Sequence, residues 1–393
     1  MSLRSSIKAL CLGYCGTLCL FMGVSRGSAA ETSAPYRVYV GTYTQGSSEG
    51  IYRFEFDPTT GKSTAPVLAA KSINPSFLAF SPSQEFLYAV NEVDDPIENK
   101  PYAKTGWVTA FRVDPATGEL HELNKQSSGG AIPCYVLIDS KSKNALVANY
   151  SGGSVACIPL LPDGSLGSQT HEVKHGKSPE EKAASRGHSI MLSPDERFAI
   201  AADAGLDKLM IYHFDAEAGL LIPASPATVF IGPKSAPRHF IFHPNKKWAF
   251  NNNESNFKIN AFDYDAASGQ PTMKQTLSTL PAGVEAKGST AEVLVHPSGK
   301  FVYVSNRGPN SIAVFQIDDA GKMTFVEATS TQGKTPRNFR IDPSGEFLLA
   351  ANQDSGTIVV FRIDQQTGKL TSTGETIRLP NPVCIKFVEP LSP

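Results

Sequence analysis

The sequence predicts an all-β fold, a seven-bladed β-propeller built from four-stranded antiparallel blades. Three observations support this prediction: a strand–turn–strand unit recurs seven times, its period is about 50 residues, and the unit that begins the chain lacks a first strand. Such a period is typical of repeat proteins, in which each unit packs against its neighbours. We therefore expect residues 31–393 to form a single domain.

The first strand of each unit is a short apolar run. The seven runs contain FLAF, YVLI, HSIML, RHFIF, AEVLV, RNFRI and VCIKF, and they begin at Phe77, Tyr135, His188, Arg238, Ala291, Arg337 and Val383. Turns such as SPDER, HPNKK and DPSGE follow the six internal runs, and their Pro, Gly and Ser residues indicate tight hairpins.

The second strand of each unit ends on a polar residue at the same point of the repeat. These ends are Tyr43, Glu92, Tyr150, Asp203, Glu254, Arg307 and Gln353. A third strand follows, as in GIYRFEFDPTTG and TIVVFRIDQQTG, and its turn ends in Gly before a weaker outer strand. Four antiparallel strands per unit are the content of one propeller blade.

The two ends of the chain complete each other. The N-terminal unit begins at a second strand, Arg37 to Tyr43, whereas the chain finishes on a lone first strand, Val383 to Val388. Pairing of these two strands would close the ring and leave no free sheet edge that invites aggregation. The alternative, a pair of β-sandwiches, does not explain why the missing strand occurs at the far end.

Residues 1–30 have the features of a secretory signal peptide. A basic head, MSLRSSIK, precedes an apolar run from Ala9 to Val24 and small residues at Ser28 and Ala30. The run is shorter than the about 20 residues that a membrane-spanning helix needs, which argues against the alternative of a retained anchor. We expect an exported protein, periplasmic or secreted, that has no membrane attachment after cleavage.

The amino-acid composition argues against some classes of binding partner. Removal of residues 1–30, which carry three basic and no acidic residues, takes the formal net charge from −1 to −4. Mild acidity without a basic run gives no indication of a nucleic-acid partner. Three cysteines remain, an odd number that argues against a disulfide framework: Cys134, Cys157 and Cys384. We expect a monomer that acts on a small molecule.

One rim of the predicted ring gathers residues that can carry chemistry. Antiparallel pairing places the starts of first strands and the ends of second strands at the same edge of each blade. Arg238 and Glu254 should therefore face each other, with His188 from the preceding blade and Arg307 from the following one. These four are the predicted catalytic residues, and the predicted substrate-binding residues are Glu292, Asn338 and Gln353.

Motifs in every blade resemble the seven-bladed lactonase family, which includes bacterial 6-phosphogluconolactonases and fungal carboxy-cis,cis-muconate cyclases. They include GTYT, NYSGGSV, PRHFIFHPN, SNRGPNSIAVF and PVCIKF, and the resemblance extends from Arg37 to Val388. It implies a lactone substrate and a catalytic cluster of His188, Arg238, Glu254 and Arg307. Many members carry a second His where this sequence has Arg186, which weighs against the cyclase activity more than against lactone hydrolysis.

Lactone opening needs an activated water, stabilisation of the carbonyl oxygen and a proton for the departing alkoxide. Glu254 can serve as general base, and His188 can carry the proton if its pKa is near the usual value of about 6.5. This predicts that replacing His188 flattens the pH dependence near neutrality. Arg238 and Arg307 can bind an anionic group or the oxyanion. The same groups can run the reverse type of reaction, so a lactonising cyclase remains an alternative.

Other functional classes remain open. Asn residues recur near the ends of second strands, and their oxygens can ring a calcium ion, as in the metal-dependent six-bladed lactonases: Asn91, Asn149, Asn253, Asn306 and Asn352. Two central Arg residues argue against a cation there, so we expect metal-independent activity and no cofactor. A non-catalytic propeller that binds a ligand or a protein is the other alternative, in which Arg238 and Glu254 form a structural ion pair.

Overall fold

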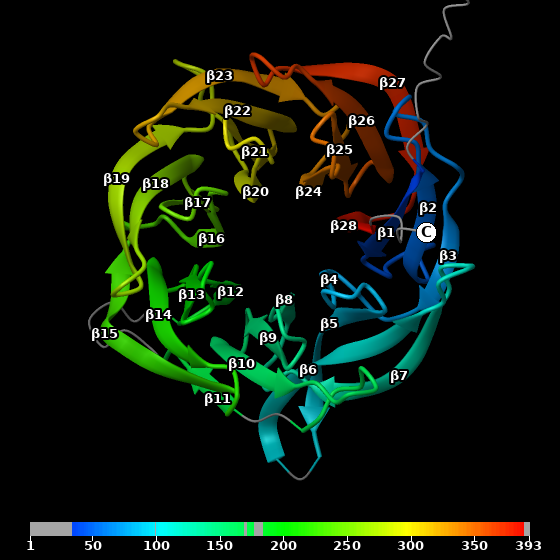
Figure 1. Cartoon of the computed structure of the whole chain (residues 1–393), viewed down its shortest axis with the longest axis vertical. Coiled ribbons are helices and arrows are strands. Elements are labelled where there is room, and N and C mark those ends of the chain that lie inside the picture. The colour runs from blue at the N-terminus through cyan, green and yellow to red at the C-terminus, as the bar shows by residue number, and fades with distance from the viewer. Residues whose placement is uncertain (1–33, 99, 169–170, 177–183, 389–393) are drawn as a thin grey trace, which may run out of the picture. The chain divides into compact units, whose positions relative to one another are not determined.

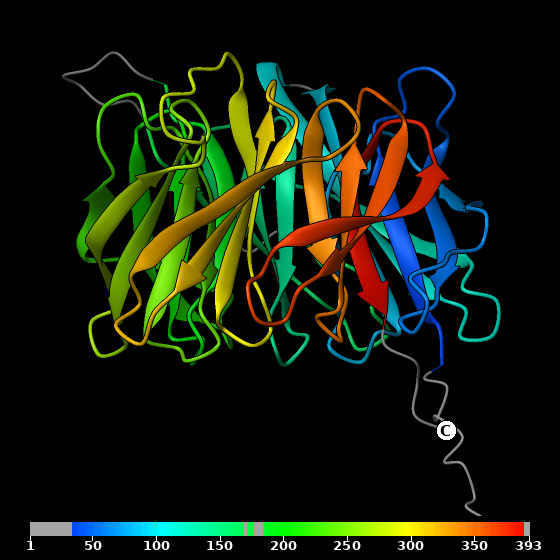
Figure 2. The ribbon, with the colours of Figure 1, turned by 90° about the horizontal axis from the view of Figure 1, so that it is seen from above.

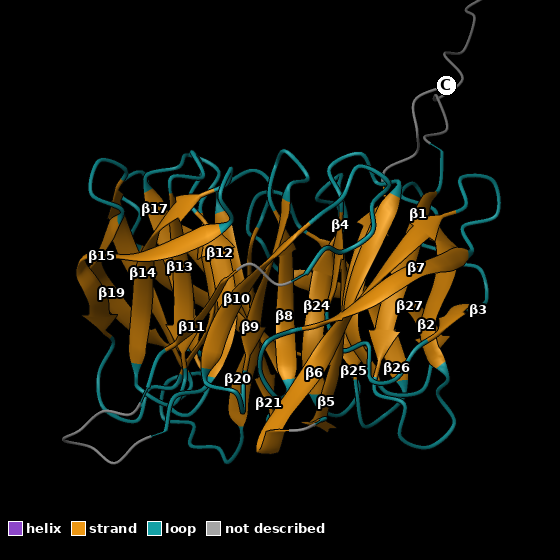
Figure 3. Cartoon of the chain, turned by 90° about the horizontal axis from the view of Figure 1, so that it is seen from below, coloured by secondary structure: helices purple, strands orange, loops and turns teal. Residues whose placement is uncertain are grey.

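A computed structural model describes residues 34–98, 100–168, 171–176 and 184–388, and within them every regular element is a β-strand. Seven four-stranded antiparallel sheets follow one another around a ring (Figure 1), which confirms the predicted seven-bladed fold. Hairpin turns and loops cover the two ends of the ring (Figure 3). The predicted signal peptide, residues 1–30, lies outside the described residues.

The blades are sheets of consecutive strands, apart from the first. From the axis outward, blade 1 contains β28 (Pro382–Val388), β1 (Tyr36–Thr42), β2 (Gly50–Phe56) and β3 (Val67–Lys71). Blade 2 contains β4 (Leu78–Phe80), β5 (Phe86–Ile97), β6 (Lys100–Val113) and β7 (Leu120–Ser127). Blade 3 contains β8 (Pro133–Ile138), β9 (Asn144–Asn149), β10 (Ser154–Pro159) and β11 (His171–Lys174).

The remaining four blades have the same order. Blade 4 contains β12 (Gly187–Leu192), β13 (Phe198–Asp203), β14 (Lys208–Asp215) and β15 (Leu220–Phe230). Blade 5 contains β16 (Pro237–Phe242), β17 (Trp248–Asn253), β18 (Lys258–Asp265) and β19 (Gln270–Ser278). Blade 6 contains β20 (Ser289–Val295), β21 (Phe301–Arg307), β22 (Ser311–Ile317) and β23 (Met323–Ser330). Blade 7 contains β24 (Pro336–Ile341), β25 (Phe347–Asn352), β26 (Thr357–Ile363) and β27 (Leu370–Arg378).

The C-terminal strand closes the ring, as the sequence predicts. β28 pairs antiparallel with β1, and Ile385 lies opposite Val40 in the register. The two strands, red and blue, lie side by side in Figure 2. Ile385 also packs with Phe347 and Phe56 in the apolar cluster between blades 7 and 1. The first and last strands of the ring are thereby joined through hydrogen bonds and through a shared core.

Buried tyrosines tie neighbouring blades together. Each lies on a second strand and donates its hydroxyl to the carbonyl of a glycine in the third-strand turn of the next blade, at distances of 2.7, 2.9 and 2.8 Å: Tyr39 to Gly118, Tyr88 to Gly164 and Tyr303 to Gly368. These glycines have left-handed φ angles of 74°, 85° and 73°, which explains why the predicted turn ends in Gly.

The recurrent Asn residues also serve as structural ties. They donate side-chain amides to carbonyls in the segment before their blade's first strand, namely Asn91 to Ile73, Asn149 to Ser128, Asn306 to Thr279 and Asn352 to Thr331. All four are buried within the blades. The amide nitrogens of these four residues thus satisfy backbone carbonyls within the blades, and the alternative of a calcium-binding ring stays a prediction.

One hairpin is longer than the repeat predicts. β5 and β6 have 12 and 14 residues and project beyond the ring (Figure 1), whereas the corresponding strands β9 and β10 have 6 residues each. Asp95 accepts a hydrogen bond from the indole of Trp107 at 2.7 Å within the extension. The extension was not predicted, because its sequence is polar and contains Pro residues, both of which usually mark a loop.

The three described cysteines are buried, and no disulfide joins them to one another. Cys134 lies on β8 and Cys157 on β10, with β9 between them, as the repeat predicts. The described part of the chain contains no helix with the length and hydropathy that a membrane span requires.

Candidate active site

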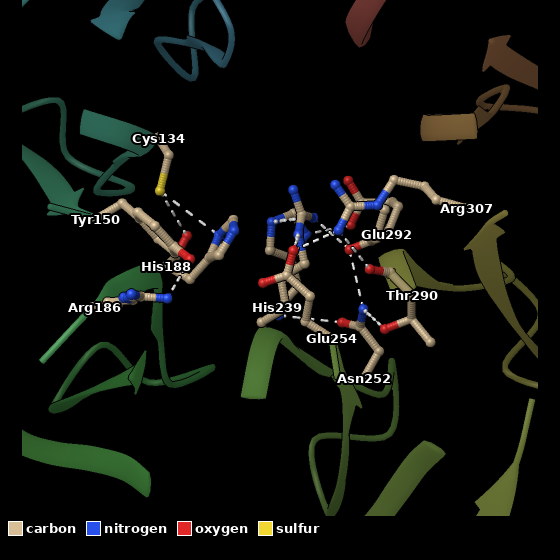
Figure 4. A network of polar contacts seen from close by, with 12 residues as sticks. Cys134, Tyr150, Arg186, His188, His239, Asn252, Glu254, Thr290, Glu292 and Arg307 are labelled. Carbon is tan, nitrogen blue, oxygen red and sulfur yellow. Dashed lines mark hydrogen bonds and ion pairs between the residues drawn. The ribbon is translucent and has the colours of Figure 1, made fainter. Parts of the chain in front are cut away.

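Three of the four predicted catalytic residues, His188, Glu254 and Arg307, are labelled in Figure 4 at the rim where first strands begin, and Nε of the fourth, Arg238, lies 4.0 Å from Glu254 Oε1. His188 lies on β12, Arg238 on β16, Glu254 directly after β17, and Arg307 at the end of β21. His188 and Arg238 are 4% and 3% exposed, so both are almost completely removed from solvent. The side chains of Glu254 and Arg307 keep 21% and 15% of their surface exposed. They face the opening of the central channel at this rim, which we call the mouth.

The local backbone directs Arg238 into the channel. Ala236 has a left-handed φ of 49°, and the pairing register shifts by a bulge between Pro237 and His239. A bulge re-aims the side chain within it, and a left-handed alanine costs roughly 1–2 kcal/mol. Asp207 stabilises this bend because its carboxylate accepts the backbone N–H of Ala236 at 2.7 Å.

Close backbone contacts hold Arg307 in place. Gly288 adopts a φ of 136°, and a Cβ atom there would lie 2.0 Å from the carbonyl oxygen of Arg307. The guanidinium Nη2 of Arg307 donates to the carbonyl of Thr290 at 3.1 Å. Blade 6 thereby orients the arginine toward its neighbour, blade 5.

Glu254 pairs more closely with Arg307 than with Arg238. Its Oε1 accepts a hydrogen bond from Arg307 Nη2, while Arg238 Nε lies 4.0 Å from the same oxygen. The predicted facing pair within one hairpin is thus a three-residue cluster, because Arg238 extends toward blade 6 and donates to the carbonyl of Ala291. Oε2 of Glu254 has no hydrogen-bond partner among the described residues and is free to contact a water or a substrate.

The charges of the cluster favour an ionised carboxylate. Burial raises the pKa of Glu254, but the attraction of Arg238 and Arg307 outweighs burial and brings the pKa below its usual value. Burial lowers the pKa of Arg238 to about 10, so this residue remains a cation at neutral pH. The Nε groups of Arg238 and Arg307 are buried and have no hydrogen-bond partner among the described residues.

A buried chain of polar groups supports Arg238 from below. Nη1 of Arg238 lies 3.1 Å from Nε2 of His239, and Nδ1 of His239 lies 2.6 Å from Oε1 of Glu292. The tautomer that fits has Nδ1–H donating to Glu292 and Nε2 accepting from Arg238. The sequence prediction assigns no catalytic role to His239. In the structure, His239 lies between Arg238 and Glu292 and holds the guanidinium of Arg238 in position.

The structure places two of the three predicted substrate-binding residues, Glu292 and Asn338, beneath the open mouth. Glu292 is 5% exposed, and its two oxygens accept hydrogen bonds from His239 and from Asn338 Nδ2, the latter at 2.5 Å. Asn338 Oδ1 in turn accepts the backbone N–H of Ile385 at 2.9 Å. Gln353 donates to its neighbour Asp354 at 3.1 Å. Glu292 and Asn338 are therefore supports beneath the site, since their hydrogen-bonding groups are already occupied.

His188 is neutral in this environment. Its Nδ1 lies 3.6 Å from Cys134 Sγ, and the edge of the Tyr150 ring packs against it with a centroid distance of 5.3 Å. Burial, followed by the charge of Arg238, lowers the pKa of His188 well below its usual value. This direction argues against the predicted titration near neutrality, because a buried ring beside an arginine takes up a proton less readily.

The far wall of the mouth holds polar residues to which the sequence analysis assigns no role. The Tyr43 hydroxyl donates to the carboxylate of Glu92 at 2.9 Å, and the Ser76 hydroxyl also donates to this carboxylate. The guanidinium of Arg337 lies 5.1 Å from the centroid of the Tyr43 ring. Their positions at strand ends in blades 1, 2 and 7 indicate that they lie at this rim. The sequence does not show which of these side chains contact one another across the three blades.

The central cavity narrows directly below the mouth. A space of about 10 Å³ remains there, and it is lined by Ser76, Phe77, Glu92, Cys134, Arg238, His239, Arg337, Asn338 and Val383. This volume holds about one water molecule. In the described ranges, no three His, Cys, Asp or Glu side chains are grouped so that they could hold a metal ion.

The family "Lactonase, 7-bladed beta-propeller" matches residues 37–387. The chain belongs to this family. Membership confirms the resemblance seen in the sequence and the prediction of a lactonase-type enzyme.

Individual lactonases of the family are similar over almost the full length of the ring. A Bacillus subtilis (strain 168) protein named 6-phosphogluconolactonase is 37% identical over 356 residues, covering 90% of this chain and 98% of its own. The 6-phosphogluconolactonase of Formosa agariphila is 32% identical over 314 residues, covering 78% and 86%. The solved structure of the periplasmic gluconolactonase of Pseudomonas aeruginosa is 33% identical with a TM-score of 0.84, covering 90% and 99%.

Proposed function

We propose that this lactonase hydrolyses a sugar lactone at the mouth formed by His188, Arg238, Glu254 and Arg307. The observation that carries the proposal is the ionised Glu254, whose Oε1 is held by arginine and whose Oε2 is free. Relatives named 6-phosphogluconolactonase and gluconolactonase support the choice of a sugar lactone over other lactones.

The proposed mechanism uses Glu254 as general base. A water molecule beside Oε2 gives up a proton as it attacks the lactone carbonyl, and the developing oxyanion is stabilised by the free N–H groups of Arg238 and Arg307. The proton that Glu254 takes from the water reaches the departing alkoxide through His188, which stays neutral because it accepts a proton at one ring nitrogen as it releases one from the other. One water is consumed, and the ring ester becomes a hydroxy acid.

We also propose that the protein is exported. Residues 1–30 have the features of a signal peptide, and the Pseudomonas aeruginosa neighbour is a periplasmic gluconolactonase. Phosphorylated sugars are not expected outside the cytoplasm, so export favours an unphosphorylated or carboxylated lactone as the natural substrate.

A panel of lactones tests the function. Purified protein without residues 1–30 should open glucono-δ-lactone or its 6-phosphate faster than the spontaneous reaction, measured as acid release in a pH-stat. Carboxymuconolactone serves as the comparison substrate. A higher kcat/KM in the direction of carboxymuconolactone formation would favour the cyclase alternative, and inactivity on every lactone would leave a binding propeller.

Replacement of Arg307 by Lys should affect binding more than the chemical step. Lysine keeps the charge but lacks the planar guanidinium, whose Nη2 donates to both Glu254 and Thr290 while its Nε has no hydrogen-bond partner among the described residues. We expect KM to rise roughly tenfold, since a charge-assisted hydrogen bond is worth about 1.5–3 kcal/mol, with a smaller change in kcat. Arg362→Lys is the matched control, because Arg362 pairs with Glu346 at a hairpin turn away from the mouth. Equal effects of the two substitutions on KM would contradict the assignment.

The pH dependence of kcat/KM should be flat around neutrality. The arginines lower the pKa of Glu254, so this group stays an active base until the pH falls below the usual glutamate value of 4.5. His188 is neutral over the same range because burial lowers its pKa. Initial rates corrected for spontaneous hydrolysis should therefore decline only on the acidic side of pH 4.5. An inflection near pH 6.5 that disappears in His188→Ala would show that His188 titrates there after all.

A further inference from the structure

A second cavity lies in the central channel beneath the layer formed by Glu292 and Asn338. It has a volume of about 60 Å³ and is lined by Phe77, Tyr135, Met191, His239, Phe240, Ile241, Glu292, Val293, Leu294, Asn338, Arg340, Ile385 and Lys386. A water molecule requires only about 10–15 Å³ of such space, so the cavity has room for a small ion together with water.

Two cations line this cavity from neighbouring first strands. The hydrogen bond between Asn338 and the backbone of Ile385 joins β24 to β28 at 2.9 Å. Side chains two residues apart on a strand share a face, so Arg340 follows Asn338 down the channel wall. Lys386 follows Ile385 on β28, and its Nζ lies 4.7 Å from the centroid of the Phe77 ring.

Neither cation has an anionic partner in the described part of the chain. Arg340 and Lys386 form no ion pair with a described carboxylate, and Glu292 is the only acidic residue in the cavity lining. Both oxygens of Glu292 are already bonded, one to His239 and the other to Asn338. The other lining side chains are apolar or uncharged, apart from the neutral His239.

The cavity therefore carries an excess of positive charge. Burial lowers the pKa of Lys386, and Arg340 also lowers it, whereas Cys384 and Glu292 act in the opposite direction without cancelling the effect. Arg340 and Lys386 are only partly exposed, and two like charges in a space that water reaches poorly repel each other unless an anion accompanies them.

We propose that this cavity binds a small inorganic anion of the size of chloride between Arg340 and Lys386. The volume of the cavity limits the size of the anion, since a sugar acid does not fit in about 60 Å³. The space of about 10 Å³ between the mouth and the cavity separates the anion from the lactone substrate. Together with the ionised carboxylate of Glu292, one bound anion balances the charges of Arg340 and Lys386, and its binding does not depend on the proposed lactone hydrolysis.

An anion that binds only the folded protein raises its stability by mass action. We expect the thermal midpoint of the wild-type protein to rise with chloride concentration and to saturate, at constant ionic strength maintained with the larger anion isethionate. Lys386→Met and Arg340→Met should each weaken the apparent chloride affinity at least about tenfold, because each removes a charged hydrogen-bond donor. Lys300→Met is the matched control, since Lys300 is exposed in a hairpin turn.

Diffraction from wild-type crystals grown without halide and soaked in sodium bromide gives a test that needs no variant. The expected result is an anomalous peak within hydrogen-bonding distance of both Arg340 and Lys386. A bromide peak confined to Arg238 and Arg307 would overturn the proposal. So would a chloride response that is equal in wild type, Lys386→Met and Arg340→Met, or one that isethionate reproduces.

Discussion

Glu254→Gln is expected to lower kcat by about 10²–10⁴-fold, the usual contribution of a general base. Glutamine keeps the shape of the side chain and can still accept a hydrogen bond from Arg307 through its amide oxygen. What it loses is the negative charge and the basicity of Oε2, which has no other partner among the described residues. Folding should survive, because the side chain is 21% exposed and lies at the mouth.

The matched control is Glu346→Gln. Glu346 also pairs with an arginine, Arg362 at 3.3 Å, but it lies at a hairpin turn away from the mouth. We expect wild-type turnover from this variant. If Glu254→Gln retains full turnover on a lactone that the wild type hydrolyses, Glu254 is only a structural partner of the arginines and another group activates the water.

Deletion of Pro382 to Pro393 is expected to abolish the stable ring. The deletion removes β28, including Val383, Cys384 and Ile385, which are at most 3% exposed. Truncating one buried aliphatic side chain costs about 2–5 kcal/mol, so losing the strand costs on the order of 10 kcal/mol. This is comparable to the whole stability of a typical domain, about 5–15 kcal/mol.

The truncated protein should also expose the edge of β1, which pairs with β28 in the complete ring. An exposed apolar edge favours aggregation, so light scattering should rise as the thermal midpoint falls. Deletion of residues 389–393 alone leaves β28 complete and serves as the control. An unchanged thermal midpoint after the longer deletion would show that ring closure does not depend on this strand.

The fold could be predicted from the sequence because the propeller repeats one pattern. Each copy of the first and second strands supports the others, so an ambiguous copy such as the three-residue strand β4 is assigned by its neighbours. The long hairpin of β5 and β6 could not be predicted, since it occurs once and has no second copy for comparison. The pairing of the first and last strands could be predicted by counting the strands in each copy of the repeat.

The site could be predicted only as a set of residues at one rim. Strand ends place Arg238, Glu254 and Arg307 near one another, but the repeat does not say that Glu254 bonds across the blade boundary to Arg307. That choice depends on the bulge at Arg238 and on the carbonyls of blade 6. Side-chain direction also separated Glu292 from the mouth, because His239 and Asn338 bind its two oxygens.

The lowered pKa of His188 could not be predicted from the sequence either, because the repeat does not determine how deeply a side chain is buried. A histidine at a strand start can be solvated or buried, and the two cases shift its pKa differently. Here burial beside Arg238 decides the outcome.

A structure of the protein with the hydroxy acid product of its lactone substrate tests the central claim most directly. We expect the product carboxylate at the mouth, within hydrogen-bonding distance of Nε of Arg238 and of Arg307 and adjacent to Glu254 Oε2. A larger cavity of about 680 Å³ lies elsewhere, between blades 1 and 2, and is lined by residues that include Arg37, Glu55 and Arg112. Product bound in that cavity, with an empty mouth, would contradict the assignment of the active site.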